Sequence, residues 1–177
     1  MKDHNKLVAA LGDARCIGIN GLDCAGKTTV ALGLLQQLQK AGENVTLLHV
    51  DDFNDMAVQN LIYSAYANGK FSDDLFQLYY EKSVDYEALA NAIKVECSPS
   101  RIVMVEGVFL YKPQLSGLFD YRVFLDVEPE VARARFAQRR LDIGDKRPTS
   151  VFDDIWLPAF ERYCWDVSPK SMADMVL

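Results

Sequence analysis

Short apolar runs alternate along the chain with longer segments whose apolar positions recur at helical spacing. The apolar runs predict strands at 16–20, 45–50, 102–105, 123–125 and 175–177. The segments with helical spacing predict helices at 27–41, 56–67, 89–95, 130–140 and 152–165. This alternation is typical of an α/β fold with a mostly parallel sheet flanked by helices. The third run is apolar throughout, which favours a central strand buried on both faces.

Three stretches lack such a pattern. Residues 68–88 are polar and rich in Tyr and Asp, and they are predicted to connect two helices. Residues 142–150 contain Gly144 and Pro148 and are predicted to form a loop. Residues 1–6 are polar, so they lack the apolar centre of a signal peptide, and His4 is expected to lie in a mobile terminus.

Length, charge and cysteine content narrow the class of protein. The 177 residues are half hydrophobic, which suits one domain over 1–177 with a real core. The net charge of −6 argues against broad nucleic-acid binding, and no apolar run approaches a membrane span. The four cysteines are scattered without a C-x-x-C pair, which predicts neither a disulfide framework nor a zinc site. We therefore expect a cytoplasmic protein with no nucleic-acid or membrane partner, while homo-oligomers stay compatible with the sequence.

A glycine-rich motif follows the first predicted strand. Residues 21–28 fit the P-loop pattern G-x-x-x-x-G-K-[ST], and Thr29 continues into the first helix. In such a loop, backbone N–H groups and the helix N-terminus surround a phosphate, the Lys reaches the β- and γ-phosphates, and the hydroxyl takes a Mg²⁺ position. The alternative is a glycine-rich turn that binds nothing. The motif predicts a site for ATP or another NTP with Mg²⁺, held by Gly21, Asp23, Cys24, Ala25, Gly26, Lys27, Thr28 and Thr29.

Acidic residues follow three other predicted strands. Asp51 and Asp52 follow the second strand, Glu106 the third and Asp126 the fourth. Since ligands of parallel sheets bind at the carboxyl ends of strands, these carboxylates are expected near the P-loop, where Glu106 or Asp51 could bind Mg²⁺. The alternatives are that Asp51 and Asp52 cap the helix near 55, that Glu106 only ends a strand, and that Asp126 pairs with a basic residue of the helix at 130–140.

That helix is strongly basic within an acidic protein. It carries Arg133, Arg135, Arg139 and Arg140, and Lys146 and Arg147 follow in the loop. The pattern favours a lid at about 133–150 that brings arginines onto phosphates, and the alternative is an ordinary solvated helix face. His49 is predicted to be a core residue. The tyrosines are predicted to pack in the core or at the surface, with one or two lining an acceptor pocket against a flat ring.

Together these motifs resemble the uridine kinase-like family of P-loop nucleoside kinases, which includes nicotinamide riboside kinases. The similarity runs from residue 17 to 177 and rests on the P-loop, Asp-Asp-Phe at 51–53, Glu-Gly at 106–107, the basic helix and the segment 156–163. The resemblance implies a P-loop NTPase fold with a helical lid, and ATP and Mg²⁺ as cofactors. It implies that Asp51 is the base near the acceptor 5′-hydroxyl and that Glu106 helps to hold Mg²⁺. It also implies that Asp85 binds ribose and that Arg135, Arg139 and Arg140 act from the lid.

The resulting hypothesis is an ATP-dependent kinase that phosphorylates the 5′-hydroxyl of a nucleoside or similar small molecule, with uridine or cytidine as the first guess. Alternatives are a kinase of nicotinamide riboside, pantothenate or a sugar, a nucleotide-binding regulatory protein, and a nuclease or ATPase that acts on nucleic acid. The chain departs from the family where base specificity is expected. It has Asn54 in place of an aromatic residue and no family signature over 57–81.

Overall fold

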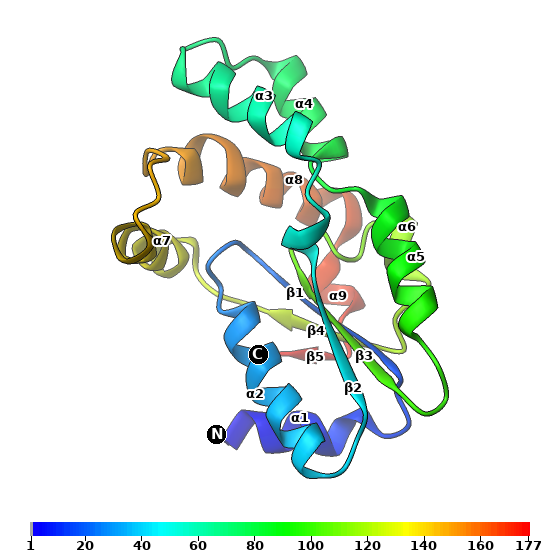
Figure 1. Cartoon of the computed structure of the whole chain (residues 1–177). Coiled ribbons are helices and arrows are strands. Elements are labelled where there is room, and N and C mark those ends of the chain that lie inside the picture. The colour runs from blue at the N-terminus through cyan, green and yellow to red at the C-terminus, as the bar shows by residue number, and fades with distance from the viewer. Residues whose placement is uncertain (1) are drawn as a thin grey trace.

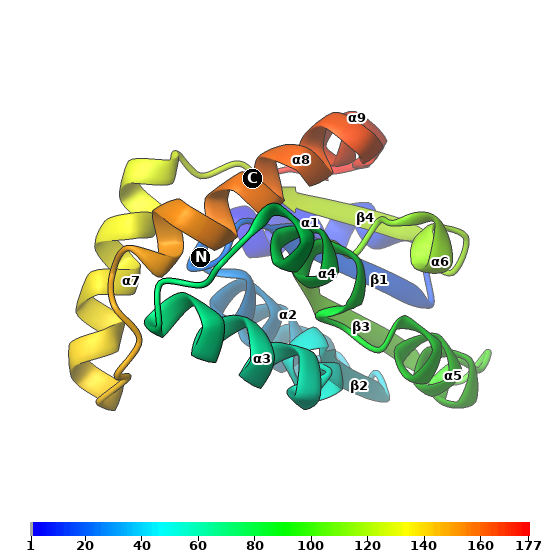
Figure 2. The same ribbon diagram turned by 90° about the horizontal axis from the view of Figure 1, so that it is seen from above.

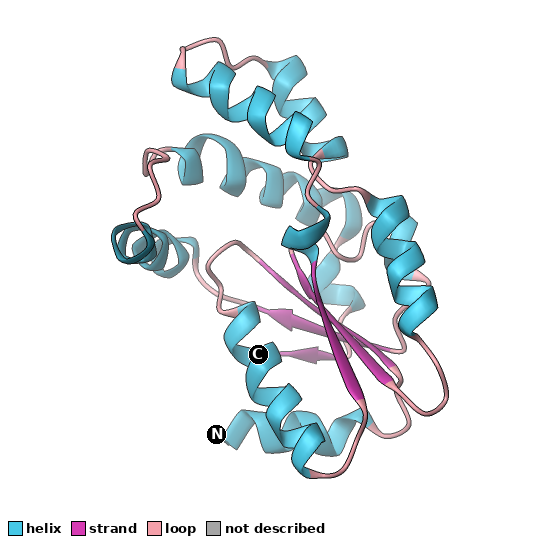
Figure 3. Cartoon of the chain, viewed as in Figure 1, coloured by secondary structure: helices cyan, strands magenta, loops and turns pink. Residues whose placement is uncertain are grey.

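The computed structural model describes the backbone of residues 2–177 and the side chains from Lys6 onward. A parallel sheet of five strands runs through this part of the chain in the order β2-β3-β1-β4-β5 (Figures 1 and 3). The strands are β1 (Cys16–Gly21), β2 (Val45–His49), β3 (Ile102–Gly107), β4 (Tyr121–Leu125) and β5 (Met175–Val176). The predicted α/β fold with a mostly parallel sheet is confirmed.

Strand register brings the chemically important positions to one edge of the sheet. β1 lies between β3 and β4, and both β1 and β3 are buried along their whole length. Ile19 pairs with Glu106, and His49 pairs with Glu106 from the other side. The carboxyl ends of β1, β2 and β3 therefore meet, and the loops that follow these strands share one edge.

Helices cover both faces of the sheet. α2 (Lys27–Lys40) and α5 (Tyr86–Glu96) lie on opposite sides of it, as Figure 1 shows, and α1 (Lys2–Leu11) packs against α2. Two short helices, α6 (Pro113–Ser116) and α9 (Pro169–Met172), lie in the segments that lead into β4 and β5. No helix in the described part of the chain combines the length and apolarity that a membrane crossing requires.

The remaining helices stand above the carboxyl edge of the sheet. α3 (Met56–Ala67) and α4 (Asp73–Lys82) form a hairpin that projects from the sheet (Figure 1). α7 (Pro129–Ile143) and a continuous helical stretch, a π-turn at Phe152–Trp156 followed by α8 (Leu157–Val167), lie across from this hairpin (Figure 2). The space between these elements contains the candidate site.

Besides the short α6 and α9, two longer helices were not predicted. α4 forms within the stretch that we expected to be an irregular connection, because Ser72 caps its N-terminus and Tyr79 and Tyr80 bury one face. α1 forms in the polar N-terminal stretch, where Leu7 and Leu11, four residues apart, bury the inner face. In α4 the acidic residues Asp73, Asp74 and Glu81 occupy the solvent side of an amphipathic helix. The basic helix also continues beyond its predicted end to Ile143, where Gly144 with φ +66° terminates it.

Candidate active site

The P-loop joins β1 to α2 with a tightly curved backbone. Cys24 and Gly26 have positive φ values of 60° and 101°, and Gly26 is the residue before the first turn of α2. A Cβ atom on Gly21 would lie 2.9 Å from the carbonyl oxygen of Leu125 on the neighbouring strand. The two motif glycines are therefore required by the close approach at Gly21 and by the left-handed backbone at Gly26.

The two polar side chains at the start of α2, Lys27 and Thr28, both form hydrogen bonds. Lys27 is buried, and its Nζ donates a hydrogen bond to the Leu22 carbonyl oxygen at 2.8 Å, across the loop. Thr28 Oγ1 donates to Glu106 Oε1 at 2.9 Å. Glu106 is only 6 % exposed, so its carboxylate is held at the sheet edge beside the loop. Thr28 and Glu106 thus offer two oxygen atoms of the kind that Mg²⁺ prefers when phosphate oxygens complete the shell.

His49 contacts the same carboxylate, which sequence reasoning missed. Its Nδ1 lies 2.7 Å from Glu106 Oε1, and its side chain is about one third exposed. We predicted a core residue, but His49 ends β2 and stands directly beside Glu106 in the sheet. Its position as the last strand residue before Asp51 was the available signal, because residues at that edge reach the site.

Two cavities meet above the P-loop. The larger, which we call the loop cavity, has a volume of about 700 Å³, within the usual range for small-molecule sites. It is lined by the loop and the start of α2, by strand ends and by α7, namely Asp23, Cys24, Ala25, Gly26, Lys27, Thr28, Thr29, Val30, Asp51, Glu106, Gly107, Val108, Arg135 and Arg139. All the P-loop residues that we predicted to bind a nucleotide, apart from Gly21 behind them, line this cavity.

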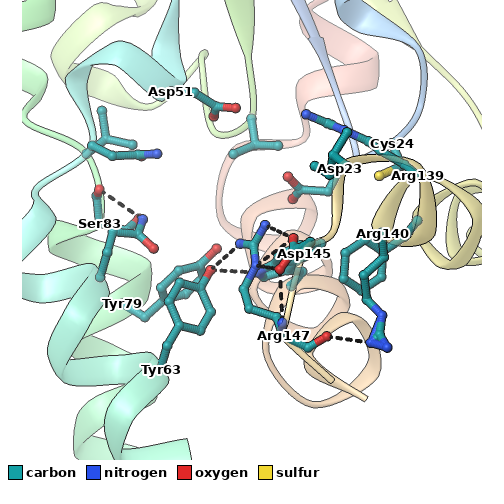
Figure 4. A pocket seen from close by; sticks show the side chains of 17 residues that line it. Asp23, Cys24, Asp51, Tyr63, Tyr79, Ser83, Arg139, Arg140, Asp145 and Arg147 are labelled. Carbon is teal, nitrogen blue, oxygen red and sulfur yellow. Dashed lines mark hydrogen bonds and ion pairs between the residues drawn. The ribbon is translucent and has the colours of Figure 1, made fainter. Parts of the chain in front are cut away.

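The second, which we call the hairpin cavity, has a volume of about 110 Å³ and lies between the α3–α4 hairpin and α7 (Figure 4). The α3–α4 segment contributes Gln59, Tyr63, Tyr79 and Ser83, and the opposite side contributes Arg139, Arg140, Asp145, Arg147 and Trp156. Asp51 lines both cavities, whereas Asp52 lines neither. The geometry thus distinguishes the two neighbouring carboxylates and places Asp51 where the cavities meet.

The floor of the hairpin cavity is an aromatic and ionic cluster. The Arg147 guanidinium carbon lies 4.9 Å from the centre of the Trp156 ring and 5.3 Å from that of Tyr63. Trp156 Nε1 donates to the Tyr63 hydroxyl at 3.0 Å. Arg147 Nη2 donates to Asp145 Oδ2 at 2.6 Å, and the hydrogen bonds from Arg147 lower the pKa of the Asp145 carboxyl. Arg147 therefore holds the loop after α7 against α3 through its contact with Tyr63.

The arginines of α7 take different positions. Arg135 Nη1 donates to the carbonyl oxygen of Ala25 at 2.9 Å, and Arg139 lines both cavities. Arg140 lines the hairpin cavity and donates to the Arg147 carbonyl oxygen at 2.9 Å. Arg133 pairs instead with Asp153, at 2.7 Å. The structure thus brings Arg135 and Arg139 to the P-loop, while Arg133 lies on an exposed face.

Two predicted positions do not join the site. Asp85 caps α5 by accepting a hydrogen bond from the Ala88 amide at 2.9 Å, and it lines neither cavity. Asp126 forms an ion pair with Lys170 at 2.5 Å, so its partner lies on α9 and not on α7. We expected an acidic residue of each strand end to gather at the P-loop, but β4 lies on the far side of β1 from Glu106 and Asp51. Tyr79 and Ser83, which line the hairpin cavity, come from a segment in which no motif was recognised, whereas Asn54 lies directly after the Asp-Asp-Phe motif, where we expected base specificity.

Comparison with known proteins agrees with this arrangement. No protein-family model matches the chain. The chain is 25% identical over 179 residues to a uridine kinase of Leuconostoc citreum, which covers 91% of this chain and 85% of the relative. The chain is similar to uridine kinase-like P-loop kinases. This similarity indicates a phosphotransferase of the kinase type that uses a nucleotide.

Solved structures show the same fold. A possible uridine kinase from Bacillus stearothermophilus superposes with a TM-score of 0.70 at 23% identity, covering 99% of this chain and 95% of that one. A structure assigned as a candidate fructose transport system kinase from Silicibacter sp. TM1040 gives a TM-score of 0.68 at 16% identity, covering 99% and 97%. At these identities the superpositions establish the P-loop kinase fold, and the acceptor must be argued from the site itself.

Proposed function

We propose that the protein is a single-domain, ATP-dependent kinase that transfers the γ-phosphoryl group to the 5′-hydroxyl of a nucleoside or similar small acceptor. The observation that carries this proposal is the position of Asp51, which lines both the loop cavity and the hairpin cavity. A protein that only senses a nucleotide needs the first cavity alone. A second cavity that opens onto the same carboxylate supports an acceptor site.

The donor triphosphate would occupy the loop cavity. The backbone N–H groups of the P-loop and the N-terminus of α2 attract the phosphates, and Lys27 adds a positive charge. Arg135 and Arg139 approach from the opposite wall and would stabilise charge that develops on the moving phosphoryl group. Phosphoryl transfer depends mostly on positioning and charge stabilisation. The positive charges of Lys27, Arg135 and Arg139 would therefore make the main contribution to catalysis.

A magnesium ion fits the oxygen atoms at the sheet edge. Thr28 Oγ1 and Glu106 Oε1 would hold it, and the ion would neutralise phosphate charge. His49 is then a positioning residue, because its Nδ1 contacts the same Glu106 oxygen and fixes the direction of the carboxylate. Among the described residues no group of three or more His, Cys, Asp or Glu side chains forms a metal site, which agrees with an ion held largely by phosphate and water.

Asp51 would serve the acceptor. A hydroxyl group is a weak nucleophile, and a carboxylate within hydrogen-bonding reach orients it and takes its proton as the new phosphorus–oxygen bond forms. Asp51 lies in a short 3₁₀ turn at Val50–Phe53 directly after β2, so a strand of the core fixes its backbone. The predicted roles of Asp51 and the arginines therefore remain proposals that this geometry supports.

Uridine or cytidine is the first choice of acceptor. The relatives named uridine kinase favour a pyrimidine nucleoside, and the aromatic side chains of Tyr63, Tyr79 and Trp156 line the hairpin cavity, where a base would contact them. A sugar is the second choice, because the hairpin cavity is small and lined by three aspartates and three arginines. A carboxylate-rich and arginine-rich wall suits a polyhydroxylated ligand in either case.

The test is a screen for acceptor-dependent ADP release with ATP and Mg²⁺ over nucleosides, pantothenate, nicotinamide riboside and small sugars. The proposal expects release that requires one of the ribose-bearing acceptors and that yields its 5′-phosphate. ATP binding without acceptor-dependent release would instead support a regulatory protein. ADP release that depends only on added nucleic acid would support an ATPase that acts on nucleic acid.

A further inference from the structure

Asn20 is the one strongly polar side chain of β1. It is fully buried and lies directly before Gly21, the first residue of the P-loop. Its amide nitrogen Nδ2 donates to the Tyr163 hydroxyl of α8 at 2.7 Å, whereas Oδ1 has no hydrogen-bond partner within the described part of the chain. Burying an amide with one unpaired end costs free energy, which indicates that Asn20 has a use other than stabilising the strand.

The Tyr163 hydroxyl accepts a second hydrogen bond, from the backbone amide of Tyr111 at 2.8 Å. Tyr111 lies in the segment that follows β3, and Glu106 stands at the end of that strand. One buried hydroxyl therefore joins the strand that leads into the P-loop to the segment that follows Glu106. Because Thr28 of the P-loop and Glu106 are the proposed Mg²⁺ ligands, this hydroxyl lies where it can fix the separation between them.

The segment after β3 also has a strained backbone that requires support. Phe109 has a φ of +55°, in the left-handed region that bulky side chains rarely adopt. Its buried ring packs edge-on against Tyr163, with 5.5 Å between the ring centres, and also against Tyr79 and Tyr80 of α4. A strained conformation persists only where its surroundings hold it firmly, and such residues cluster at functional sites. Tyr163 supports this segment twice, through its ring and through its hydroxyl.

We propose that the Tyr163 hydroxyl is a positioning group for the nucleotide site and that, together with Asn20, it sets the separation between the P-loop and Glu106. This inference rests on the proposed kinase function and adds two residues that line neither cavity. Without the Tyr163 oxygen, the Asn20 amide and the Tyr111 N–H group would be buried without an acceptor. The two segments would then have to move apart or admit water, and the phosphate and Mg²⁺ positions would lose their alignment.

The experiment compares nucleotide affinity with folding stability. A non-hydrolysable ATP analogue with Mg²⁺ is titrated calorimetrically into the wild type and the variants, and urea denaturation is followed by circular dichroism. Tyr163→Phe keeps the ring and removes the oxygen, so it should weaken the analogue about 10-fold, the lower end of the effect of losing an outer partner of a metal ligand. Asn20→Ala should weaken it about 2- to 10-fold while the urea midpoint changes little, because the unpaired Oδ1 is removed as well.

Tyr111→Phe is the matched control within the same buried cluster. The Tyr111 hydroxyl donates to the carbonyl oxygens of Gly18 and Val123, at 2.9 and 2.8 Å, in the middle of β1 and β4. Its removal should lower the urea midpoint and leave the affinity for the analogue unchanged. The double variant Asn20→Ala/Tyr163→Phe should bind the analogue no more weakly than Tyr163→Phe alone, because the two side chains act through one contact.

Wild-type affinity of Tyr163→Phe and Asn20→Ala, with only the urea midpoint lowered, would show a purely structural role and overturn the proposal. An equal loss of affinity in Tyr111→Phe would overturn it too, since any weakening of the core would then suffice. If Tyr163→Phe does not fold, Asn20→Ala decides. If the variants weaken the analogue as expected but no acceptor is phosphorylated, the kinase proposal fails while the positioning role stands. A wild type that binds no analogue would overturn both.

Discussion

The two cavities of the site are built in different ways. The loop cavity is formed mainly by one continuous segment, 23–30, and by the ends of buried strands. The hairpin cavity collects residues from positions as distant as Asp23 and Trp156, on elements that stand above the sheet. The first depends on backbone geometry, and the second depends on side chains that meet across a gap. In the proposed kinase, phosphate binding would therefore depend on the fold core, whereas acceptor choice would depend on the elements that stand above the sheet.

The contacts that close the hairpin cavity join segments that lie far apart in the sequence. The Tyr66 hydroxyl lies 2.6 Å from Ser150 Oγ and also donates to the Asp154 carboxylate, which joins α3 to the segment after the basic helix. Arg147 joins the same two regions through Tyr63. These links involve partly exposed polar groups, which individually contribute little to stability. We propose that the segment 133–150 acts as a lid, and opening it would break these links together with the packing of Phe136 against Trp156.

The largest effect should follow from removing the positive charge of the loop cavity. Lys27→Ala should lower kcat by roughly 10²- to 10³-fold, because an electrostatic contact to the transition state is lost. The matched control is Lys40→Ala at the exposed end of the same helix, which should keep wild-type turnover. Steady-state kinetics on the acceptor found in the screen gives both values. Near-normal turnover of Lys27→Ala would remove the basis for a P-loop kinase.

The second effect tests whether α7 acts on the moving phosphoryl group. Arg139→Ala should lower kcat by roughly 10- to 100-fold and change the acceptor KM less, because the contact is made mainly in the transition state. Arg133→Ala, which removes the exposed pair with Asp153 and the contact with the Phe152 ring but leaves both cavities intact, is the control and should keep wild-type kinetics. If the two variants give the same kinetics, the basic helix is an ordinary solvated face.

The third effect tests how rigid the strand ends beside the loop cavity are. A Cβ atom on Gly107 would lie 2.2 Å from Val50 Cγ2, so Gly107→Ala should lower the free energy of unfolding by about 1–3 kcal/mol through overpacking. Gly117→Ala has no heavy atom within 4 Å of its new methyl group and serves as the control. Urea denaturation followed by circular dichroism measures both. A Gly107→Ala protein as stable as the control would show that this edge of the sheet adjusts freely.

The smallest effect concerns His49. His49→Gln should raise the Mg²⁺ concentration for half-maximal activity by about 10-fold, because Glu106 loses the partner that orients it. The acceptor KM should change little, since His49 lines neither cavity. A Mg²⁺ titration at saturating ATP and acceptor separates these values. An altered acceptor KM at unchanged Mg²⁺ dependence would place His49 on the acceptor side instead.

The difference between the loop cavity and the hairpin cavity also explains which part of the site could be predicted from the sequence. The loop cavity follows from a contiguous motif and from the acidic residue after β3, since both lie where parallel strands end. The hairpin cavity could not be assembled in advance because Tyr63, Asp145 and Arg147 come from separate segments and meet Trp156 only through tertiary packing. Asp85 matched a family position, yet its carboxylate is used by the helix that it caps. His49 was taken for a core residue because strand patterning does not reveal that the side chain at the strand end contacts Glu106.

Asp51 is proposed to act as the base for the acceptor hydroxyl, which a kinase needs and a nucleotide sensor does not. One paired measurement tests this role directly. ATP affinity by titration and acceptor-dependent ADP release are compared for the wild type, Asp51→Asn and Asp52→Asn. We expect Asp51→Asn to bind ATP normally and to lose roughly 10²-fold or more in phosphoryl transfer, the usual scale for a general base, while Asp52→Asn stays much closer to wild type. Full activity of Asp51→Asn, or an inactive Asp52→Asn beside it, would contradict the account.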